Sequence, residues 1–275
     1  MSGALWALSV QTFKVTLRSK WLLMFTIVFF FFAFNLPFVL LQLMHLLPGN
    51  YVSAFMATLI NTSFALMPLL ALPLGAVSIV EERESGALQY MLSTPISRGK
   101  FLAARALGLL LATTSIIALG FGSAALIEFR FTAGATGLLY VTLAACILNA
   151  TMVGVSLVIA TVSRRRLTAH SLAILIWFLL TYAAASALGQ ISVLSRAGEY
   201  GALLPWIFLN PVEVSRLVAV MQIPGSGIQD IGATGVAMQI LFTNSALPVL
   251  YGVAAMWVGI SLVAAFVIFT FQDIR

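Results

Sequence analysis

Charge is scarce in this sequence. Only 8% of its 275 residues are Asp, Glu, Lys or Arg, whereas 61% are hydrophobic. A soluble domain has about 25% charged and about 45–50% apolar residues. So few charged side chains could not cover a soluble globule, and the mean hydropathy of +1.09 agrees. The composition therefore excludes an ordinary soluble enzyme and a disordered protein, and it predicts an all-α protein of membrane-spanning helices.

Metal ligands and nucleotide-binding motifs are equally rare. The single cysteine, Cys146, can form neither an internal disulfide nor a metal cluster, and the two histidines lie at opposite faces of the predicted membrane domain. The Gly-x-x-x-x-Gly-Lys loop that binds ATP is absent, because Thr94 occupies the position of its first glycine before Gly99 and Lys100. We therefore predict that this chain has no metal site and no catalytic residue, and that it binds no cofactor itself.

Ionisable groups are also missing from the long apolar runs. None of the acidic residues lies inside a run, and among the basic residues only Arg105 enters one, near its end, where the side chain could extend to the interface. Proton relays and ion pathways usually need such groups within the membrane. The sequence thus disfavours a proton- or sodium-driven transporter and a membrane-embedded enzyme. Because carbonyl groups alone can hold sodium, sodium coupling stays open.

Six apolar runs are each long enough to cross a bilayer as a helix. They cover about residues 21–44, 55–80, 101–127, 137–162, 168–188 and 247–271. Of the 14 Lys and Arg residues, all except Arg130, Arg196 and Arg216 fall on the side that holds both termini. Basic loops remain in the cytoplasm, so both termini are predicted to be cytoplasmic in a multi-pass protein of the cell membrane. This asymmetry explains the net charge of +6 without a nucleic-acid partner.

Residues 1–20 precede the first span and have helical periodicity. One apolar stripe is formed by Trp6, Val10, Phe13, Leu17 and Trp21. Basic residues at the edge of the stripe would face lipid phosphates, so we predict an amphipathic helix in the cytoplasmic membrane interface. The alternative is that this helix simply continues the first span into water. Residues 21–275 then form the six-span membrane domain.

The cytoplasmic loop 81–100 is the most informative stretch. Four charged residues, 81–84, are predicted to end the second span in water, and Gly86 permits a bend. Leu88 and Leu92 belong to a short apolar stripe at helical spacing, and Pro95 stops the helix. Such a short amphipathic helix could insert into a groove on another protein. The alternative is a solvated connecting loop.

The motif in this loop resembles the signature of permease subunits in the type-2 ABC exporter family. It reads Glu82-Arg83-Glu84-x-Gly86-x-Leu88, then Leu92-x-x-Pro95-x-x-Arg98-x-Lys100. The resemblance covers nearly the whole chain and implies a permease that works as a homodimer on separate ATPase subunits, which would bind the ATP and Mg. It also implies that the coupling residues are Glu82, Arg83, Glu84, Gly86, Leu88, Leu92, Pro95 and Arg98. A second cytoplasmic contact, or a phospholipid anchor, would be Arg164, Arg165 and Arg166.

The outer segment, 189–246, is half apolar and is expected to lie against the membrane surface. Its stretch Leu-Leu-Pro-Trp-Ile-Phe-Leu-Asn-Pro at 203–211, with Glu213, Arg216 and the Gly-Ser-Gly at 225–227, is similar to permeases that serve maturation of nitrous-oxide reductase. This narrower resemblance implies a NosF-like ATPase, a NosD-like periplasmic partner, and a sulfur species as cargo for a copper–sulfide centre. The residues that would contact the outer partner or form a lid are Pro205, Trp206, Asn210 and Pro211.

Two other functions fit the sequence. One is a general exporter of lipid, drug or another small cargo. The other is a mechanical transmitter, in which nothing crosses the membrane and ATP-driven motion only reshapes an outer partner protein.

Overall fold

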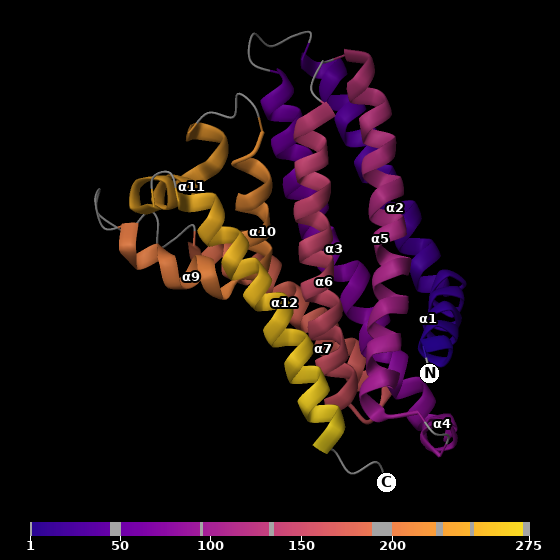
Figure 1. The fold of residues 1–275 in the computed structure, drawn as a ribbon. Coiled ribbons are helices and arrows are strands. Elements are labelled where there is room, and N and C mark those ends of the chain that lie inside the picture. The colour runs from indigo at the N-terminus through magenta and orange to yellow at the C-terminus, as the bar shows by residue number, and fades with distance from the viewer. Residues whose placement is uncertain are drawn as a thin grey trace.

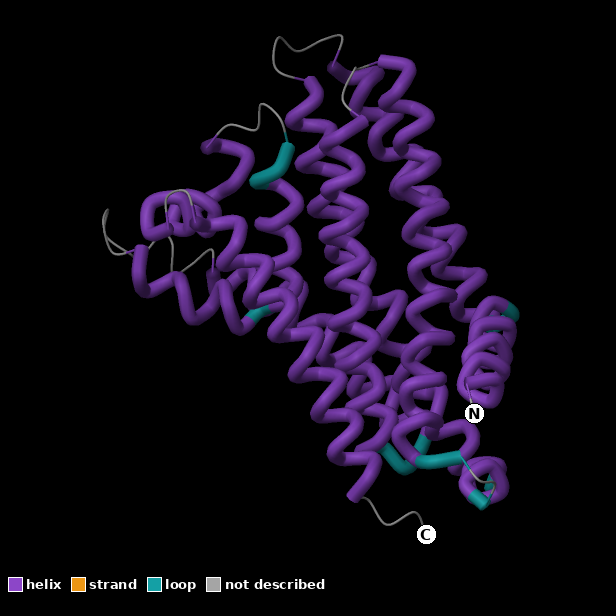
Figure 2. Tube along the Cα trace, viewed as in Figure 1, coloured by secondary structure: helices purple, strands orange, loops and turns teal. Residues whose placement is uncertain are grey.

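The computed structural model describes residues 2–44, 51–93, 96–131, 135–188, 200–223, 228–242 and 245–271. Within these ranges all regular structure is helical (Figures 1 and 2). Five helices are long and apolar enough to cross a membrane, or six if the bent pair formed by the first two helices counts as one span. The chain is therefore an all-α, multi-pass membrane protein, as its composition predicted.

The long helices follow the predicted spans and extend several of them into charged sequence. They are α2 (Lys20–Met44), α3 (Tyr51–Glu84), α5 (Arg98–Phe131), α6 (Ala135–Val162), α7 (Arg166–Phe178) and α12 (Ala246–Phe271). A π-helical turn, η1 (Leu179–Ala183), continues α7, so that this span reaches Leu188. α3 continues through charged residues 81–84 and ends at Glu84, because their side chains find partners on neighbouring helices.

α6 lies at the centre of the bundle and packs against α3, α5, α10 and α12. Two glycines allow the closest approaches. A Cβ atom at Gly75 of α3 would overlap Ser156 of α6, and one at Gly154 of α6 would overlap Ser261 of α12. Small residues let helix backbones approach closely inside membranes, where no hydrophobic effect drives helices together. The core is thus a tightly packed set of α3, α6 and α12.

The N-terminal helix, α1 (Ser2–Leu17), lies beside α5 and is bent by 65° from α2 (Figure 1). Its buried face consists of Ser9, Thr12 and Thr16, and Thr12 packs directly over Gly108 of α5. Trp6 of the apolar stripe is exposed. The small polar side chains of α1 therefore face the bundle, and Trp6 points away from it, where lipid can cover the ring.

The outer segment forms η2 (Tyr200–Leu203), α9 (Leu204–Leu209), α10 (Pro211–Val220) and α11 (Ile228–Phe242). These helices lie against the side of the bundle rather than across its end (Figure 1). Every residue of α10 except Arg216 is buried, and the helix packs against α3, α6 and α12. α10 is therefore part of the packed bundle, and its apolar residues lie on all sides of the helix.

Candidate functional site

Three consecutive charged residues in the last turn of α3 each contact a different helix. Glu82 reaches α5, Arg83 reaches the end of α6, and Glu84 reaches the start of α7. Successive side chains on an α-helix point about 100° apart, so neighbouring residues can bind partners in three directions. We call Glu81, Glu82, Arg83 and Glu84, with their partners Arg105 and Arg166, the charged cluster.

Glu82 forms an ion pair with Arg105, and both side chains are largely buried, at 16% and 8% exposed. Arg105 Nη1 also donates to Thr12 Oγ1, at 3.3 Å. The side chain of Arg105 does not end in open solvent: it is buried between α1, α3 and α5. Breaking a buried pair by removing one partner is strongly destabilising, so this contact holds three helices in one arrangement.

Arg83 binds the carboxyl end of α6. Its guanidinium donates to the carbonyl of Ser163 at 2.6 Å and to that of Thr161 at 3.3 Å. The last carbonyls of a helix lack partners within the helix and carry partial negative charge. A cation placed there supplies the missing hydrogen bonds and fixes α6 to α3.

Glu84 and Glu81 bind Arg166, the first residue of α7. Arg166 Nε lies 2.9 Å from Glu84 Oε2, and Arg166 Nη1 lies 3.2 Å from Glu81 Oε1. The backbone N–H of Arg166 also donates to Glu84 Oε1 at 2.9 Å, where a carboxylate suits the start of a helix. Arg164 and Arg165 are exposed. The two predicted cytoplasmic contacts, the 81–100 loop and the three arginines, thus meet at one surface.

The short helix α4 (Ala87–Leu92) follows the charged cluster directly. Gly86 has φ of 75°, a left-handed conformation that other residues rarely adopt, and it turns the chain out of α3. Leu88 is completely buried, whereas Tyr90 is 77% exposed. Leu88 is therefore not available to enter a groove on another protein, and the exposed face of α4 presents Gln89 and Tyr90 instead. The side chain of Leu92, together with Thr94 and Pro95, lies outside the described residues.

Arg98 joins this end of the molecule to the last span. Its Nη1 donates to the carbonyl of Thr270 near the end of α12, at 2.8 Å. Gly99 beside it packs against the ring of Phe266. The predicted coupling residues from 82 to 98 that the structure describes therefore touch α5, α6, α7 and α12. A displacement of α4 would be passed to all of these helices.

The described residues contain no group of three His, Cys, Asp or Glu side chains that could share a metal ion. The side chains of the charged cluster form ion pairs and hydrogen bonds between helices instead. Such contacts can pass a movement of one helix to its neighbours.

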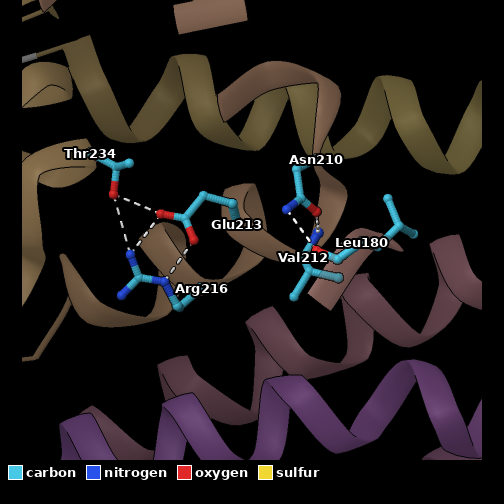
Figure 3. Close-up of polar contacts among 6 residues, drawn as sticks. All are labelled: Leu180, Asn210, Val212, Glu213, Arg216 and Thr234. Carbon is cyan, nitrogen blue, oxygen red and sulfur yellow. Dashed lines mark hydrogen bonds and ion pairs between the residues drawn. The ribbon is translucent and has the colours of Figure 1, made fainter. Parts of the chain in front are cut away.

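The outer segment is attached to the spans through Asn210 (Figure 3). Its Oδ1 accepts the N–H of Val212 at 3.0 Å and so caps α10, with Pro211 at the favoured first helical position. Its Nδ2 donates to the carbonyl of Leu180 at 2.9 Å, within the π-helical turn. Asn210 and Pro211 are buried, while Pro205 and Trp206 are exposed. The Gly-Ser-Gly at 225–227 lies outside the described residues.

A second ion pair lies within α10. Glu213 accepts two hydrogen bonds from Arg216, at 2.6 and 2.8 Å, and one from Thr234 of α11, at 2.6 Å (Figure 3). Burial alone would raise the pKa of Glu213, but the hydrogen bonds and positive charge of Arg216 outweigh it and leave the pKa below its ordinary value. Burial opposes the charge on Arg216 as well, but Glu213 raises the pKa of its guanidinium. Both groups are therefore charged at neutral pH.

Two further hydrogen bonds join the outer segment to α12. Trp257 Nε1 donates to the carbonyl of Phe208 at 2.8 Å, and Gln222 Nε2 donates to the hydroxyl of Tyr251 at 2.9 Å. With the Asn210 contact to Leu180, the outer helices are fixed to both the fifth and the last span. They would follow those spans if the spans moved.

Comparison with known proteins identifies the family. The profile described as ABC-2 family transporter protein matches residues 6–274, nearly the whole chain. This chain belongs to the ABC-2 transporter family. The resemblance inferred from the 82–100 motif is confirmed, and the protein is a permease-type membrane subunit of a transporter.

This ABC-2 permease is similar to two curated relatives, each described as a probable ABC transporter permease protein NosY. The protein from Stutzerimonas stutzeri is 29% identical over 275 residues, covering 96% of this chain and 97% of the relative. The protein from Pseudomonas aeruginosa is 28% identical over 271 residues, covering 94% of this chain and 95% of the relative. The permease is thus NosY-like over nearly its entire length.

Sequence reasoning about this permease missed the contacts of Arg105 with Glu82 and Thr12, and it missed Tyr90. Arg105 was noticed as the one basic residue inside a span, but nothing in the linear sequence pairs it with Glu82. A helical wheel could have found Tyr90, because it lies about 200° around the helix from Leu88. If Leu88 faces inward, Tyr90 must face outward.

Proposed function

We propose that this permease is the membrane-spanning subunit of an ATP-driven exporter. It has six spans in the inner membrane and both termini in the cytoplasm, and it works as a homodimer. Two copies of a separate, NosF-like ATPase bind the ATP and Mg on the cytoplasmic side. The observation that carries the proposal is the charged cluster, in which residues 82–84 connect α5, α6 and α7 to the turn that leads into α4.

α4 is the coupling helix in this proposal. Its buried Leu88 anchors it to the permease, and its exposed Tyr90 and Gln89 meet the ATPase. Nucleotide-driven movement of the ATPase shifts α4 together with the charged cluster. Because packed interfaces have discrete arrangements, the spans then rock as rigid bodies and change access along the dimer interface.

Exchange of Tyr90 for alanine tests this role. An aromatic residue at the centre of an interface commonly contributes about 2 kcal/mol or more to binding. We expect Tyr90→Ala to weaken binding to the co-expressed ATPase at least tenfold in pull-down titrations, with normal permease yield. Tyr140→Ala is the matched control, since Tyr140 is also exposed but lies near the start of α6. α6 begins at the end of the bundle opposite α4 (Figure 1). Unchanged ATPase binding by the Tyr90 variant would contradict the proposal.

The cargo we propose is a sulfur species, exported for assembly of the copper–sulfide centre of nitrous-oxide reductase. This choice is supported by the full-length similarity to NosY permeases and by the outer motif around 203–211. A NosD-like periplasmic protein would receive the cargo near the exposed Trp206. Inverted vesicles that contain the permease and its ATPase should accumulate a labelled sulfur compound only with ATP. Uptake of another small cargo instead would indicate a general exporter.

A mechanical transmitter is the second candidate function. It is favoured by the hydrogen bonds that fix the outer segment to two spans, from Asn210 to the carbonyl of Leu180 and from Trp257 to that of Phe208. In this case ATP would change the labelling rate of a cysteine introduced at Trp206, in a Cys146→Ala background, without any solute flux. Flux and labelling measured on the same vesicles separate the two functions.

A further inference from the structure

A cavity of about 210 Å³ lies beside the charged cluster, where the hinge between α1 and α2 meets α3, α5 and α7. Its polar lining residues include Ser19, Trp21, Ser78, Glu82, Arg105 and His170. A polar cavity of about 10–15 Å³ is enough for one water molecule. This space is therefore large enough for a small polar group of several atoms.

Three buried polar atoms around this cavity have no hydrogen-bond partner among the described residues. They are the donors Arg105 Nε–H and Trp21 Nε1–H and the acceptor Glu82 Oε2. Arg105 is only 7% exposed, so water does not reach it freely. Buried polar groups are normally satisfied, and those on charged side chains are the most costly to leave unpaired. Two donors and one acceptor on one cavity indicate a ligand that offers both kinds of group.

We propose that this cavity binds the headgroup of a phospholipid that carries a phosphate and a primary ammonium, the chemistry of phosphatidylethanolamine. The phosphate accepts hydrogen bonds from Arg105 Nε and Trp21 Nε1, as guanidinium groups do readily with phosphate. The ammonium donates to Glu82 Oε2. Glu81 also lines the cavity, but its carboxylate is paired with Arg166. Arg105 and Glu82 are then the two opposite charges that face the two charges of a zwitterion.

Other headgroups match the site less well. Choline has no N–H group to donate to Glu82, and a glycerol headgroup offers only a neutral hydroxyl in place of the charged ammonium. The apolar walls formed by Val15, Leu74 and Val77 suit the start of the acyl chains. Trp21 also lies at the hinge of a predicted interfacial helix, and tryptophan is enriched at the headgroup level of membranes. These features favour a lipid over a soluble molecule with the same headgroup.

Lipid exchange on the unmodified permease tests the proposal. The protein is placed in nanodiscs of equal phosphatidylethanolamine, phosphatidylcholine and phosphatidylglycerol, and retained lipids are counted by native mass spectrometry. We expect about one phosphatidylethanolamine per chain, retained at least tenfold over the other two lipids. Phosphatidylcholine cannot donate to Glu82, and phosphatidylglycerol replaces the ion-paired hydrogen bond with a weaker one from a neutral hydroxyl. Equal retention of the three lipids, or retention of none, would overturn the proposal.

Two further arms locate the site and identify the source of the headgroup. Trp21→Phe removes one donor but keeps an aromatic ring, and it should lower retention about tenfold. Trp206→Phe, far from the cavity, is the matched control, and equal retention by the two variants would overturn the assignment. Soluble glycerophosphoethanolamine should displace little of the lipid. Full displacement at similar concentration would support the same headgroup chemistry but assign it to a soluble ligand.

Discussion

The described part of the permease contains two buried ion pairs, one in the charged cluster and one in the outer segment. Glu82 and Arg105 belong to different spans, whereas Glu213 and Arg216 lie three residues apart on α10. The first pair leaves Glu82 Oε2 and Arg105 Nε without partners among the described residues. In the second pair, both oxygens of Glu213 accept hydrogen bonds. One pair is therefore long-range and incomplete, and the other is local and complete.

This difference shows what each pair can do. A pair between spans fixes their relative position, so it resists or transmits movement of one span against another. A pair within one helix mainly stabilises that helix, and here it also ties α10 to α11 through Thr234. We therefore expect changes at Glu82 to disturb the whole bundle and changes at Glu213 to act locally.

Removal of Glu82 should have the largest effect. Glu82→Ala leaves the charge of Arg105 buried without its carboxylate, which typically costs about 3–5 kcal/mol. We expect a large drop in the thermal midpoint in detergent and a loss of monodisperse protein in size-exclusion chromatography. The double variant Glu82→Leu with Arg105→Met should recover much of the loss, because apolar replacement of both partners is often nearly neutral. A double variant as unstable as the single one would show that the unpaired charge is not the cause.

Acidification should have a smaller effect, through Glu213. Because its pKa in the folded protein is below the ordinary value of 4.5, its ionised form stabilises the fold at all pH values above that value. This stabilisation is lost as pH falls below 4.5 and through the lowered pKa. Glu213→Gln should lose about 1–3 kcal/mol at neutral pH and lack that part of the acid dependence. Thermal midpoints of both proteins between about pH 7 and pH 3 measure it. Parallel loss of stability in the two proteins would contradict this assignment.

The spans could be predicted from the sequence because a long run of apolar residues identifies a helix that can lie in the hydrocarbon core of the membrane. Their ends could not, because a helix backbone continues as long as its charged residues have partners. α3 runs to Glu84 since Arg105 and Arg166 neutralise its last turn. Those partners lie on helices that become neighbours only after folding.

The sequence predicted a short helix within the 81–100 loop, which α4 confirms, but it did not predict which face of that helix is exposed. Leu88 was expected to face another protein because it belongs to an apolar stripe. Such a stripe indicates a contact surface, but it does not show whether the contact is with another protein or with another part of the same chain. In the structure the stripe packs against the permease itself. Similarly, the apolar residues of α10 gave no sign that they would be buried among α3, α6 and α12 rather than in lipid.

Arg166 should give the smallest change in stability, and it separates exposed from buried charge in the cluster. Its side chain is 50% exposed, so its bridges to Glu81 and Glu84 should contribute about 1 kcal/mol or less. Salt at about 1 M screens exposed charges over about 3 Å, against about 10 Å at 0.1 M. The difference in thermal midpoint between wild type and Arg166→Ala should therefore shrink in high salt, while the defect of Glu82→Ala persists.

Arg165→Ala, an exposed neighbour at the same loop, serves as the control and should change the thermal midpoint at neither salt concentration. If salt instead abolished the Glu82→Ala defect, the Glu82–Arg105 pair would have to be accessible to ions, and the contrast between this inter-span pair and the surface bridges would fail.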